Sequence, residues 1–315
     1  MLGNFNNVMR TRRSQFSGNL VPSAHQSVLL QEAIDSLVIA ADDVVVDATL
    51  GGAGHAKVIA KALGKEGVLI GFDLDADAIE RARKALVNVA PAVHLIEANF
   101  RNLQKELEAR GIKRITKALF DLGWSSYQLD SGRGFSFQRD EPLSMAYSKN
   151  ATLSAATIVN EWAEESIADI VYGFGEERYA RKIAKRIVER RAKKPFTTSS
   201  ELGEFIREIV PPHYRRGRIH PATRTFQALR IAVNDELGAL TAALQSTREM
   251  LMANGRIAVI TFHSLEDRLV KQAFRDWAKA GEGSQLTKKP ITPTSEETAQ
   301  NPRSRSGKLR VFEKT

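Results

Sequence analysis

The stretch Val44-Val-Val-Asp-Ala-Thr-Leu-Gly-Gly-Ala-Gly-His55 decides the fold. Its three valines predict a short buried strand, and the apolar stripe of Val58, Ile59 and Leu63 predicts a helix after the glycines. Glycines let the backbone approach a ligand closely, and a helix that begins there presents free N–H groups. A strand, a glycine-rich turn and a helix in this order predict a cofactor-binding unit of an α/β protein.

Further strands follow along the chain, with helical patterns between them. Residues 68–72 form a second apolar run that ends at Asp73, 93–96 form a third, and 118–120 form a fourth that ends at Asp121. Strands that alternate with helices at this spacing predict a parallel, doubly wound sheet. Ligands of such sheets bind at the carboxyl ends of the strands.

The alternation is then interrupted by a long segment without a strand pattern. Residues 151–210 are helical and strongly charged, and strands return only at 255–262 and 308–312. We therefore predict one α/β domain with a helical insertion. Its parts are a basic flexible arm at 1–24, the α/β domain at 25–127 and 219–315, and the insertion at 128–218. The Pro/Ser/Thr-rich stretch 284–306 is expected to be mobile.

Composition and charge narrow the function classes. The 315 residues include no cysteine, which excludes disulfides, thiolate zinc sites and cysteine nucleophiles. A net charge of +9 favours a polyanionic partner such as RNA. No apolar run approaches the ~18 residues of a membrane helix. Residues 1–24 lack the apolar core of a secretory signal, so we expect a cytoplasmic protein. The alternative is that these residues form an organelle presequence.

The first turn and Asp73 predict a nucleoside-containing cofactor. A carboxylate at the end of the second strand can accept both hydroxyls of an adenosine ribose. The dinucleotide fingerprint needs a third glycine where this chain has Lys57, and the Walker signature is absent. S-adenosylmethionine, which has no pyrophosphate, therefore fits better than NAD. A glycine-rich turn without a ligand is the alternative.

Two polar segments follow strands and predict the reaction centre. In Asp121-Leu-Gly-Trp-Ser-Ser-Tyr-Gln128, Asp121 can accept a hydrogen bond from an amino group that is to be methylated. Trp124 and Tyr127 either stack on a base or pack the insertion against the core. His263 is a candidate catalytic residue, as a base or a substrate donor, with a helix-capping role as the alternative.

Basic residues of the insertion predict a surface for RNA. Residues 176–194 hold nine Lys/Arg and three Glu, and 213–230 hold five arginines and no acid. A solvated helix face is the alternative. The candidate phosphate ligands are Arg178, Lys182, Arg186, Arg215, Arg216, Arg218, Arg224 and Arg230. A polar stripe of helical spacing is expected to line the cleft: Thr223, Gln227, Arg230 and Asn234.

With these motifs the chain resembles the bacterial RsmH (MraW) family over residues 25–315. The resemblance is carried by His25-Gln-Ser-Val-Leu-Leu, the 47–55 loop, Asp121-Leu-Gly-x-Ser-Ser-x-Gln-Leu-Asp130, Arg133-Gly-Phe-Ser-Phe137, Gly175-Glu-Glu-Arg178, His220-Pro-Ala-Thr-Arg-Thr-Phe-Gln-Ala-Leu-Arg230, Phe262-His-Ser-Leu-Glu-Asp-Arg268 and Asn301-Pro-Arg-Ser-Arg-Ser-Gly-Lys-Leu-Arg310. It departs from the family pattern at three positions: Trp124 and Tyr127 replace a usual aliphatic residue and a usual small residue or proline, and Ser144 replaces a usual Asp.

The resemblance implies a class I S-adenosylmethionine-dependent methyltransferase fold and an activity. The implied activity is methylation of N4 of a cytidine in 16S ribosomal RNA, cytidine 1402 of the decoding centre. The expected partner is this RNA within the small ribosomal subunit. The implied cofactor residues are Ala53, Gly54, His55, Asp73, Phe100, Asp121 and Gln128. Two other readings stay open, a small-molecule methyltransferase of the same fold and a non-catalytic RNA-binding protein. The sequence also leaves open whether the chain forms a homodimer, and it predicts no metal.

Overall fold

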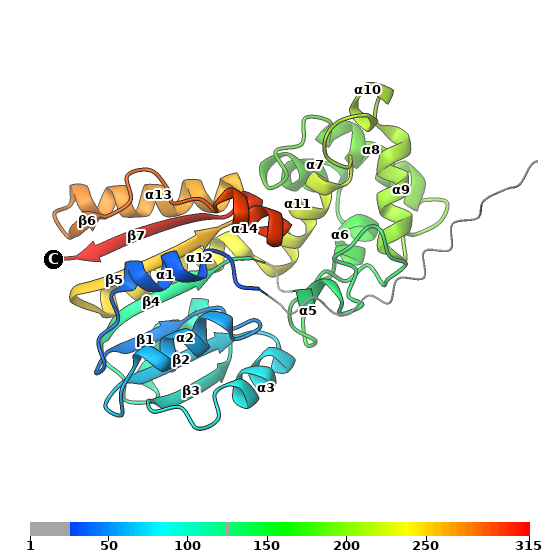
Figure 1. Ribbon diagram of the computed structural model, residues 1–315. Helices are drawn as coiled ribbons and strands as arrows, with labels where there is room; N and C mark the ends of the chain where they lie inside the picture. The colour runs from blue at the N-terminus through cyan, green and yellow to red at the C-terminus, as the bar shows by residue number, and fades with distance from the viewer. Residues whose placement is uncertain (1–25, 124–125) are drawn as a thin grey trace, which may run out of the picture.

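A seven-stranded sheet forms the centre of the larger lobe (Figure 1). The computed structural model describes residues 26–123 and 126–315. Within these, the strand order is β3-β2-β1-β4-β5-β7-β6. The strands are β1 Val44–Asp47, β2 Val68–Asp73, β3 Ala92–Glu97, β4 Ile115–Asp121, β5 Leu251–Thr261, β6 Gly283–Gln285 and β7 Lys308–Lys314. The first five are parallel, whereas β7 runs antiparallel to β5 and β6.

Helices cover both faces of the sheet, which confirms the predicted doubly wound α/β fold. One face packs against α1 Leu30–Leu37, α2 Gly54–Ala62 and α3 Ala76–Ala85. The other packs against α4 Leu103–Glu108, α12 Glu236–Met250 and α13 Ser264–Lys279. In β2, Leu69 faces the first layer whereas Ile70 and Phe72 face the second, as the two-residue period of a strand requires. Burial on both faces explains why these strands are continuous apolar runs.

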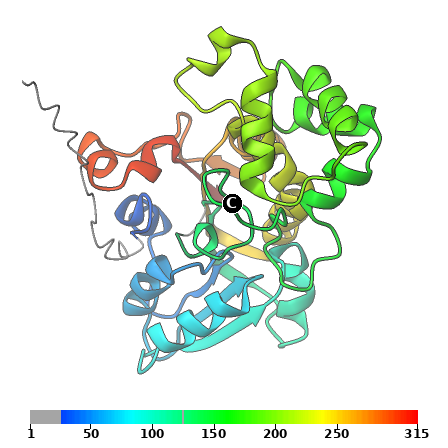
Figure 2. The same ribbon diagram turned by 90° about the vertical axis from the view of Figure 1, so that its right-hand side faces the viewer.

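The helical insertion forms a second lobe with a core of its own (Figures 1 and 2). Its helices are α5 Ser126–Leu129, α6 Ala155–Glu161, α7 Glu164–Gly173, α8 Ala180–Arg191, α9 Ser199–Ile209, α10 Pro212–Arg215 and α11 Thr223–Asn234. Phe226 and Leu229 of α11 belong to this core. The helical cluster therefore extends past residue 218, while the division of the chain into domains at 128 and 218 stays a prediction.

The 284–306 stretch is folded, so the expectation of a mobile segment was wrong. It contains α14 Ser295–Gln300 and the 3₁₀ helix η2 Pro302–Ser306. Glu297 Oε1 accepts the backbone N–H of Leu29 at 2.8 Å, and the Asn301 amide donates to Gln26 O at 3.1 Å. These bonds tie the stretch to a segment more than 250 residues away, which its Pro/Ser/Thr composition did not indicate. The arm at 1–24 lies outside the described residues.

None of the helices in the described ranges is both long and apolar enough to cross a membrane.

Candidate active site

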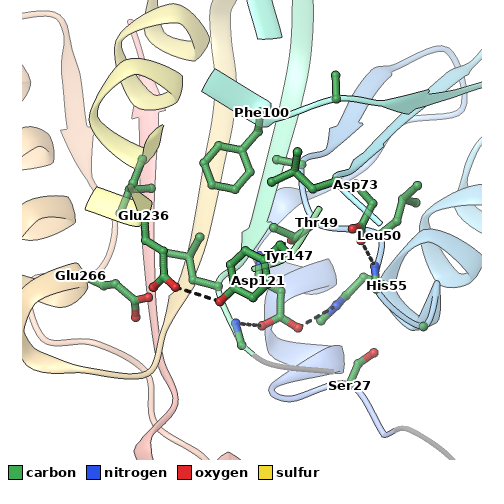
Figure 3. Close-up of a pocket in the computed structure, with 18 residues that line it drawn as sticks. Ser27, Thr49, Leu50, His55, Asp73, Phe100, Asp121, Tyr147, Glu236 and Glu266 are labelled. Carbon is green, nitrogen blue, oxygen red and sulfur yellow. Dashed lines mark hydrogen bonds and ion pairs between the residues drawn. The ribbon is translucent and has the colours of Figure 1, made fainter. Parts of the chain in front are cut away.

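A cleft opens at the carboxyl edge of the sheet, between the two lobes (Figure 3). Its empty volume, which includes open solvent at the mouth, is about 910 Å³. Strand ends β1, β2 and β4 supply one wall, and the first turns of α12 and α13 supply another. The lining residues are Ser27, Ala48, Thr49, Leu50, Gly51, Gly52, His55, Asp73, Leu74, Ala98, Phe100, Asp121, Leu122, Gly123, Tyr147, Glu236, Leu240 and Glu266.

The glycine-rich turn has the backbone that close ligand approach requires. Gly51 has a φ of +49°, in the left-handed region that favours glycine. A Cβ at Gly54, the first residue of α2, would lie 2.0 Å from Ser27 Oγ, so a larger residue would displace the Ser27 hydroxyl. Ala53, at a φ of 60°, is the N-cap of α2 and is fully buried. Of the predicted turn residues, His55 lines the cleft together with Gly51 and Gly52. Ala53 and Gly54 are not in the described lining, so their cofactor roles stay predictions.

Asp73 reaches the cleft from the end of β2 with both carboxylate oxygens already engaged. Oδ2 accepts the N–H of Gly51 at 2.8 Å, and Oδ1 accepts the N–H of Asp75 at 2.9 Å. Burial raises the pKa of Asp73, while these two backbone N–H bonds act in the opposite direction. Each oxygen keeps a lone pair for a ligand, as two vicinal ribose hydroxyls require.

The charges of the lining suit S-adenosylmethionine better than a dinucleotide. The described lining has four carboxylates, those of Asp73, Asp121, Glu236 and Glu266, and contains no Lys or Arg. A sulfonium and an ammonium group are stabilised by such surroundings, whereas a pyrophosphate would be repelled. Phe100, which packs edge-on against Phe120 at 5.8 Å, adds an apolar wall for an adenine. The residues present therefore fit this cofactor.

Asp121 stands at the end of β4 and is fixed by its neighbours. Its N–H donates to Thr49 Oγ1 at 2.7 Å, and its Oδ1 accepts the N–H of Gly123 at 3.2 Å. A Cβ at Gly123 would lie 2.6 Å from the Phe262 ring, which explains the glycine. His55 Nδ1 lies 3.6 Å from Asp121 Oδ2, and burial lowers the pKa of His55. The pair is thus a neutral imidazole beside a carboxylate.

His263 caps helix α13, which is the alternative left open by the sequence. It is the N-cap residue, its Nδ1 accepts the Glu266 N–H at 3.4 Å, and Glu266 Oε2 accepts the His263 N–H at 3.3 Å. This reciprocal pair is a capping box. His263 is not among the residues that line the cleft, so its predicted catalytic role has no support in the geometry.

Three residues that the sequence did not single out as site residues, Tyr147, Glu236 and Glu266, also line the cleft. Ligand atoms of Glu236, Glu266 and His263 lie within 4.8 Å of one another, close enough for a metal ion. Glu236, however, is paired with Arg230, and Glu266 accepts backbone N–H groups of the capping box. These acids therefore act as fixed acceptors in the wall of the cleft. Both stand in the first turn of a helix. Glu266 lies within the Phe262–Arg268 motif quoted above, whereas no motif marks Glu236.

The predicted RNA ligands divide into exposed and buried residues. Arg178, Lys182, Arg186, Arg215, Arg216 and Arg218 are exposed. Among these, the Arg186 guanidinium pairs with Glu189 at 2.8 Å and that of Arg215 donates to backbone carbonyls, at 3.1 Å to that of Val210. Arg224 is half-buried and donates to the Glu176 carbonyl at 2.7 Å.

Arg230 is only 5% exposed and forms a bidentate ion pair with Glu236, so its assignment to RNA binding was wrong. The polar stripe of α11 was also misassigned, because none of its four residues lines the cleft. Gln227 donates to the Phe174 carbonyl, and Asn234 accepts the Tyr147 N–H and donates to the Met145 carbonyl. Gln227 and Asn234 thus join α11 to the loops of its own lobe, whereas Arg230 joins it to α12.

Part of the 121–128 loop lies outside the described residues. Trp124 and Ser125 lie outside the described residues, as do the side chains of Ser126 and Gln128. Tyr127 is 43% exposed, and the Arg81 guanidinium lies 4.2 Å from its ring centroid. The cofactor role predicted for Gln128 stays a prediction.

Asp47 is expected to make the stability of the cofactor-free protein depend on pH. Burial raises its pKa from 3.8 to about 6, and its Oδ2 has no hydrogen-bond partner among the described residues. The folded state thus binds more protons than the unfolded state between these values. The stabilising contribution is complete below pH 3.8 and is lost as the pH rises through 6. Asp47→Asn should therefore gain stability relative to wild type across this window, by roughly 2–3 kcal/mol at pH 8.

Thermal unfolding of both proteins from pH 4 to 8 measures this difference. The exposed Asp42→Asn, five positions earlier, is the control and should run parallel to wild type. A constant offset between Asp47→Asn and wild type at every pH would show that Asp47 titrates normally.

Comparison with known proteins gives a consistent result. The model of the MraW methylase family matches residues 22–315. Ribosomal RNA small subunit methyltransferase H of Clostridioides difficile is 45% identical, and that of Brevibacillus brevis is 46% identical, each over 92% of this chain and 98% of the relative. A solved rRNA methylase from Streptococcus thermophilus covers 92% of this chain and 97% of its own at 12% identity. Its TM-score of 0.43 is too low to bear on function.

Proposed function

The chain belongs to the MraW methylase family and is an S-adenosylmethionine-dependent methyltransferase of the class I fold; from this premise we propose that it methylates N4 of a cytidine in 16S ribosomal RNA. The observation that carries the choice of an amine is Asp121, a fixed carboxylate at the end of β4 in the cofactor cleft. The two curated relatives quoted above are named for the small-subunit ribosomal RNA, and the family resemblance points to cytidine 1402.

The chemistry needs an oriented amine. Bound S-adenosylmethionine supplies an electrophilic methyl group on a sulfonium and leaves as a neutral thioether. The lone pair of an aromatic amine is delocalised into the ring, so the enzyme must hold the amine in line and stabilise the positive charge that develops on nitrogen. Asp121 accepts one N–H of the amine. When the N–CH₃ bond forms, the nitrogen loses one proton, to Asp121 or through it to water.

Residue types of the chain argue against the main alternatives. Methylation at C5 of cytosine normally needs a cysteine nucleophile, and this chain has none. Ribose 2′-O-methylation usually relies on a lysine, and residues 121–128 contain none. Adenine N6 is an amine like cytosine N4, and here the family resemblance makes the choice. The base must be unstacked to enter the cleft, which suits single-stranded or flipped RNA.

Nucleoside analysis by mass spectrometry tests the proposal. Small ribosomal subunits from cells that lack the protein should gain N4-methylcytidine when they are incubated with protein and S-adenosylmethionine. A product of 5-methylcytidine, N6-methyladenosine or a 2′-O-methyl nucleoside would refute the assignment of the atom. Turnover of a small molecule without RNA would favour the hypothesis of a small-molecule methyltransferase. RNA binding without turnover would favour the hypothesis of a non-catalytic RNA-binding protein.

A cytoplasmic location, association with the subunit and homodimer formation stay predictions.

Arg216 and Arg218 are expected to bind RNA phosphates without reading bases. Both are exposed in the loop after α10, whereas the guanidinium of Arg215 is engaged by backbone carbonyls. Replacing both with Gln should weaken binding about equally for different RNA sequences. It should also flatten the slope of log K against log salt by about 0.7–0.9 for each lost contact.

Binding isotherms between low and moderate salt measure that slope. Arg275→Gln with Lys279→Gln removes the same charge from the far end of α13 and is the matched control (Figure 1). If the two double variants have equal slopes, the loop after α10 does not contact the RNA backbone.

A further inference from the structure

Tyr147 is the side chain of the helical insertion that reaches the described lining of the cleft (Figure 3). Its ring stacks on Phe135, with centroids 5.6 Å apart and planes 19° apart. Its backbone N–H donates to Asn234 Oδ1 at 2.9 Å, and its carbonyl accepts a hydrogen bond from Arg133. The ring and the backbone are therefore both held, as positioning of a ligand requires.

The hydroxyl hydrogen of Tyr147 is already committed. It is donated to Glu236 Oε1 at 2.9 Å. Glu236 in turn accepts two bonds from the Arg230 guanidinium, at 2.7 and 2.8 Å, the bidentate geometry of a strong charge-assisted pair. Burial raises the pKa of Tyr147 well above its usual value, so the phenol keeps its hydrogen.

A Tyr hydroxyl has one hydrogen and two lone pairs. Because Glu236 takes the hydrogen, Tyr147 Oη presents only acceptor capacity to a ligand in the cleft. Glu236, Glu266 and Asp121 are acceptors as well. This part of the wall therefore matches a group that donates hydrogen bonds and opposes a group that accepts them.

We propose that Tyr147 Oη accepts a hydrogen bond from the exocyclic amine of the target base and so selects an amino base over a keto base; this inference rests on the proposed function. Figure 3 shows Asp121 and Tyr147 facing the same part of the cleft from β4 and from the insertion. Asp121 accepts one N–H and Tyr147 the other. Glu236 and Arg230 are positioning residues, since they act by fixing the direction of the Tyr147 hydroxyl.

Two acceptors on one amine also serve the transfer of the methyl group. The two N–H bonds of an aromatic amine lie in the plane of the base, and the lone pair stands perpendicular to it. Holding both hydrogens fixes that plane and aims the lone pair at the methyl group. Uracil has a carbonyl oxygen at the same place, which would face two acceptors and leave their lone pairs unpaired, a costly arrangement in a desolvated site.

Tyr147→Phe tests the inference, because it removes the hydroxyl and keeps the ring that stacks on Phe135. The probes are a short oligouridine with one central cytidine and the same oligouridine without it, so the pair differs by one amino base. Affinities are measured by fluorescence anisotropy with S-adenosylhomocysteine at saturation. Wild type should prefer the cytidine probe by roughly a hundredfold, about tenfold for each of the two acceptors, Asp121 and Tyr147, that face the amine. Tyr147→Phe should reduce this preference to roughly tenfold, with no loss of affinity for the uridine probe.

Tyr172→Phe is the matched control, since Tyr172 is 70% exposed on α7 and does not line the cleft. It should retain the wild-type preference. If wild type methylates cytidine in small subunits and Tyr147→Phe keeps the full preference, the inference fails while the proposed function stands. If wild type lacks the preference, the inference is also overturned. If wild type makes no N4-methylcytidine in small subunits, the proposed function itself fails.

Discussion

Replacing Asp121 with alanine is expected to lower the turnover number by two or more orders of magnitude while the protein stays folded. Asp121 Oδ1 accepts the Gly123 N–H, and no basic side chain is among the described residues of the cleft except His55. Alanine therefore removes the carboxylate that orients the amine and stabilises its developing charge. Losses of 10²–10⁴ are typical when one such group is removed.

Asparagine at position 121 separates orientation from charge. Its carbonyl can still accept the Gly123 N–H, but its NH₂ group then points a donor at the amine. Asp121→Asn should therefore retain little activity, above that of Asp121→Ala. Single-turnover rates at saturating S-adenosylmethionine, with cofactor affinity measured by calorimetry in parallel, test this. Asp276→Asn, an exposed carboxylate on α13, is the control. A turnover within tenfold of wild type would exclude Asp121 as the orienting group.

Local patterns in the sequence predicted the α/β lobe because its elements are fixed by short-range chemistry. The apolar runs at 68–72 and 93–96 lie within β2 and β3, and Asp73 and Asp121 each end a strand. In a doubly wound sheet, topology alone then brings these two acids to the same edge. The sequence could therefore place one wall of the cleft without any knowledge of side-chain packing.

The opposite wall depends on contacts between separate structural elements, and the sequence did not reveal it. Arg230 has the spacing of a polar helix stripe, and a stripe of that kind usually faces solvent or a ligand. Its partner Glu236 stands on the next helix, so the pair forms only when α11 and α12 meet. Tyr147 comes from an irregular loop, where periodicity gives no direction. Buried polar networks are therefore the part of this site that needed the structure.

Asp73→Ala and Asp73→Asn are expected to weaken S-adenosylmethionine binding to a similar degree, about 10- to 150-fold, the loss of charge-assisted bonds worth roughly 1.5–3 kcal/mol. Asparagine usually retains part of the ability of a carboxylate to accept hydrogen bonds from a ligand. In Asp73, however, each oxygen also accepts a backbone N–H, from Gly51 or Asp75. An NH₂ group in either place would oppose a donor with a donor and disturb the turn that shapes the cleft.

Calorimetric titration of the purified protein measures the affinities of the wild type and both variants. Asp77→Asn removes the same charge four positions later, from an exposed carboxylate that pairs with Lys149 at 3.0 Å, and should bind like wild type. An Asp73→Asn affinity close to that of wild type would show that the side chain accepts no ribose hydroxyl. If Asp73→Asn bound clearly better than Asp73→Ala, the two backbone bonds would not be the constraint, because one amide oxygen would then be enough to hold both the turn and the ribose.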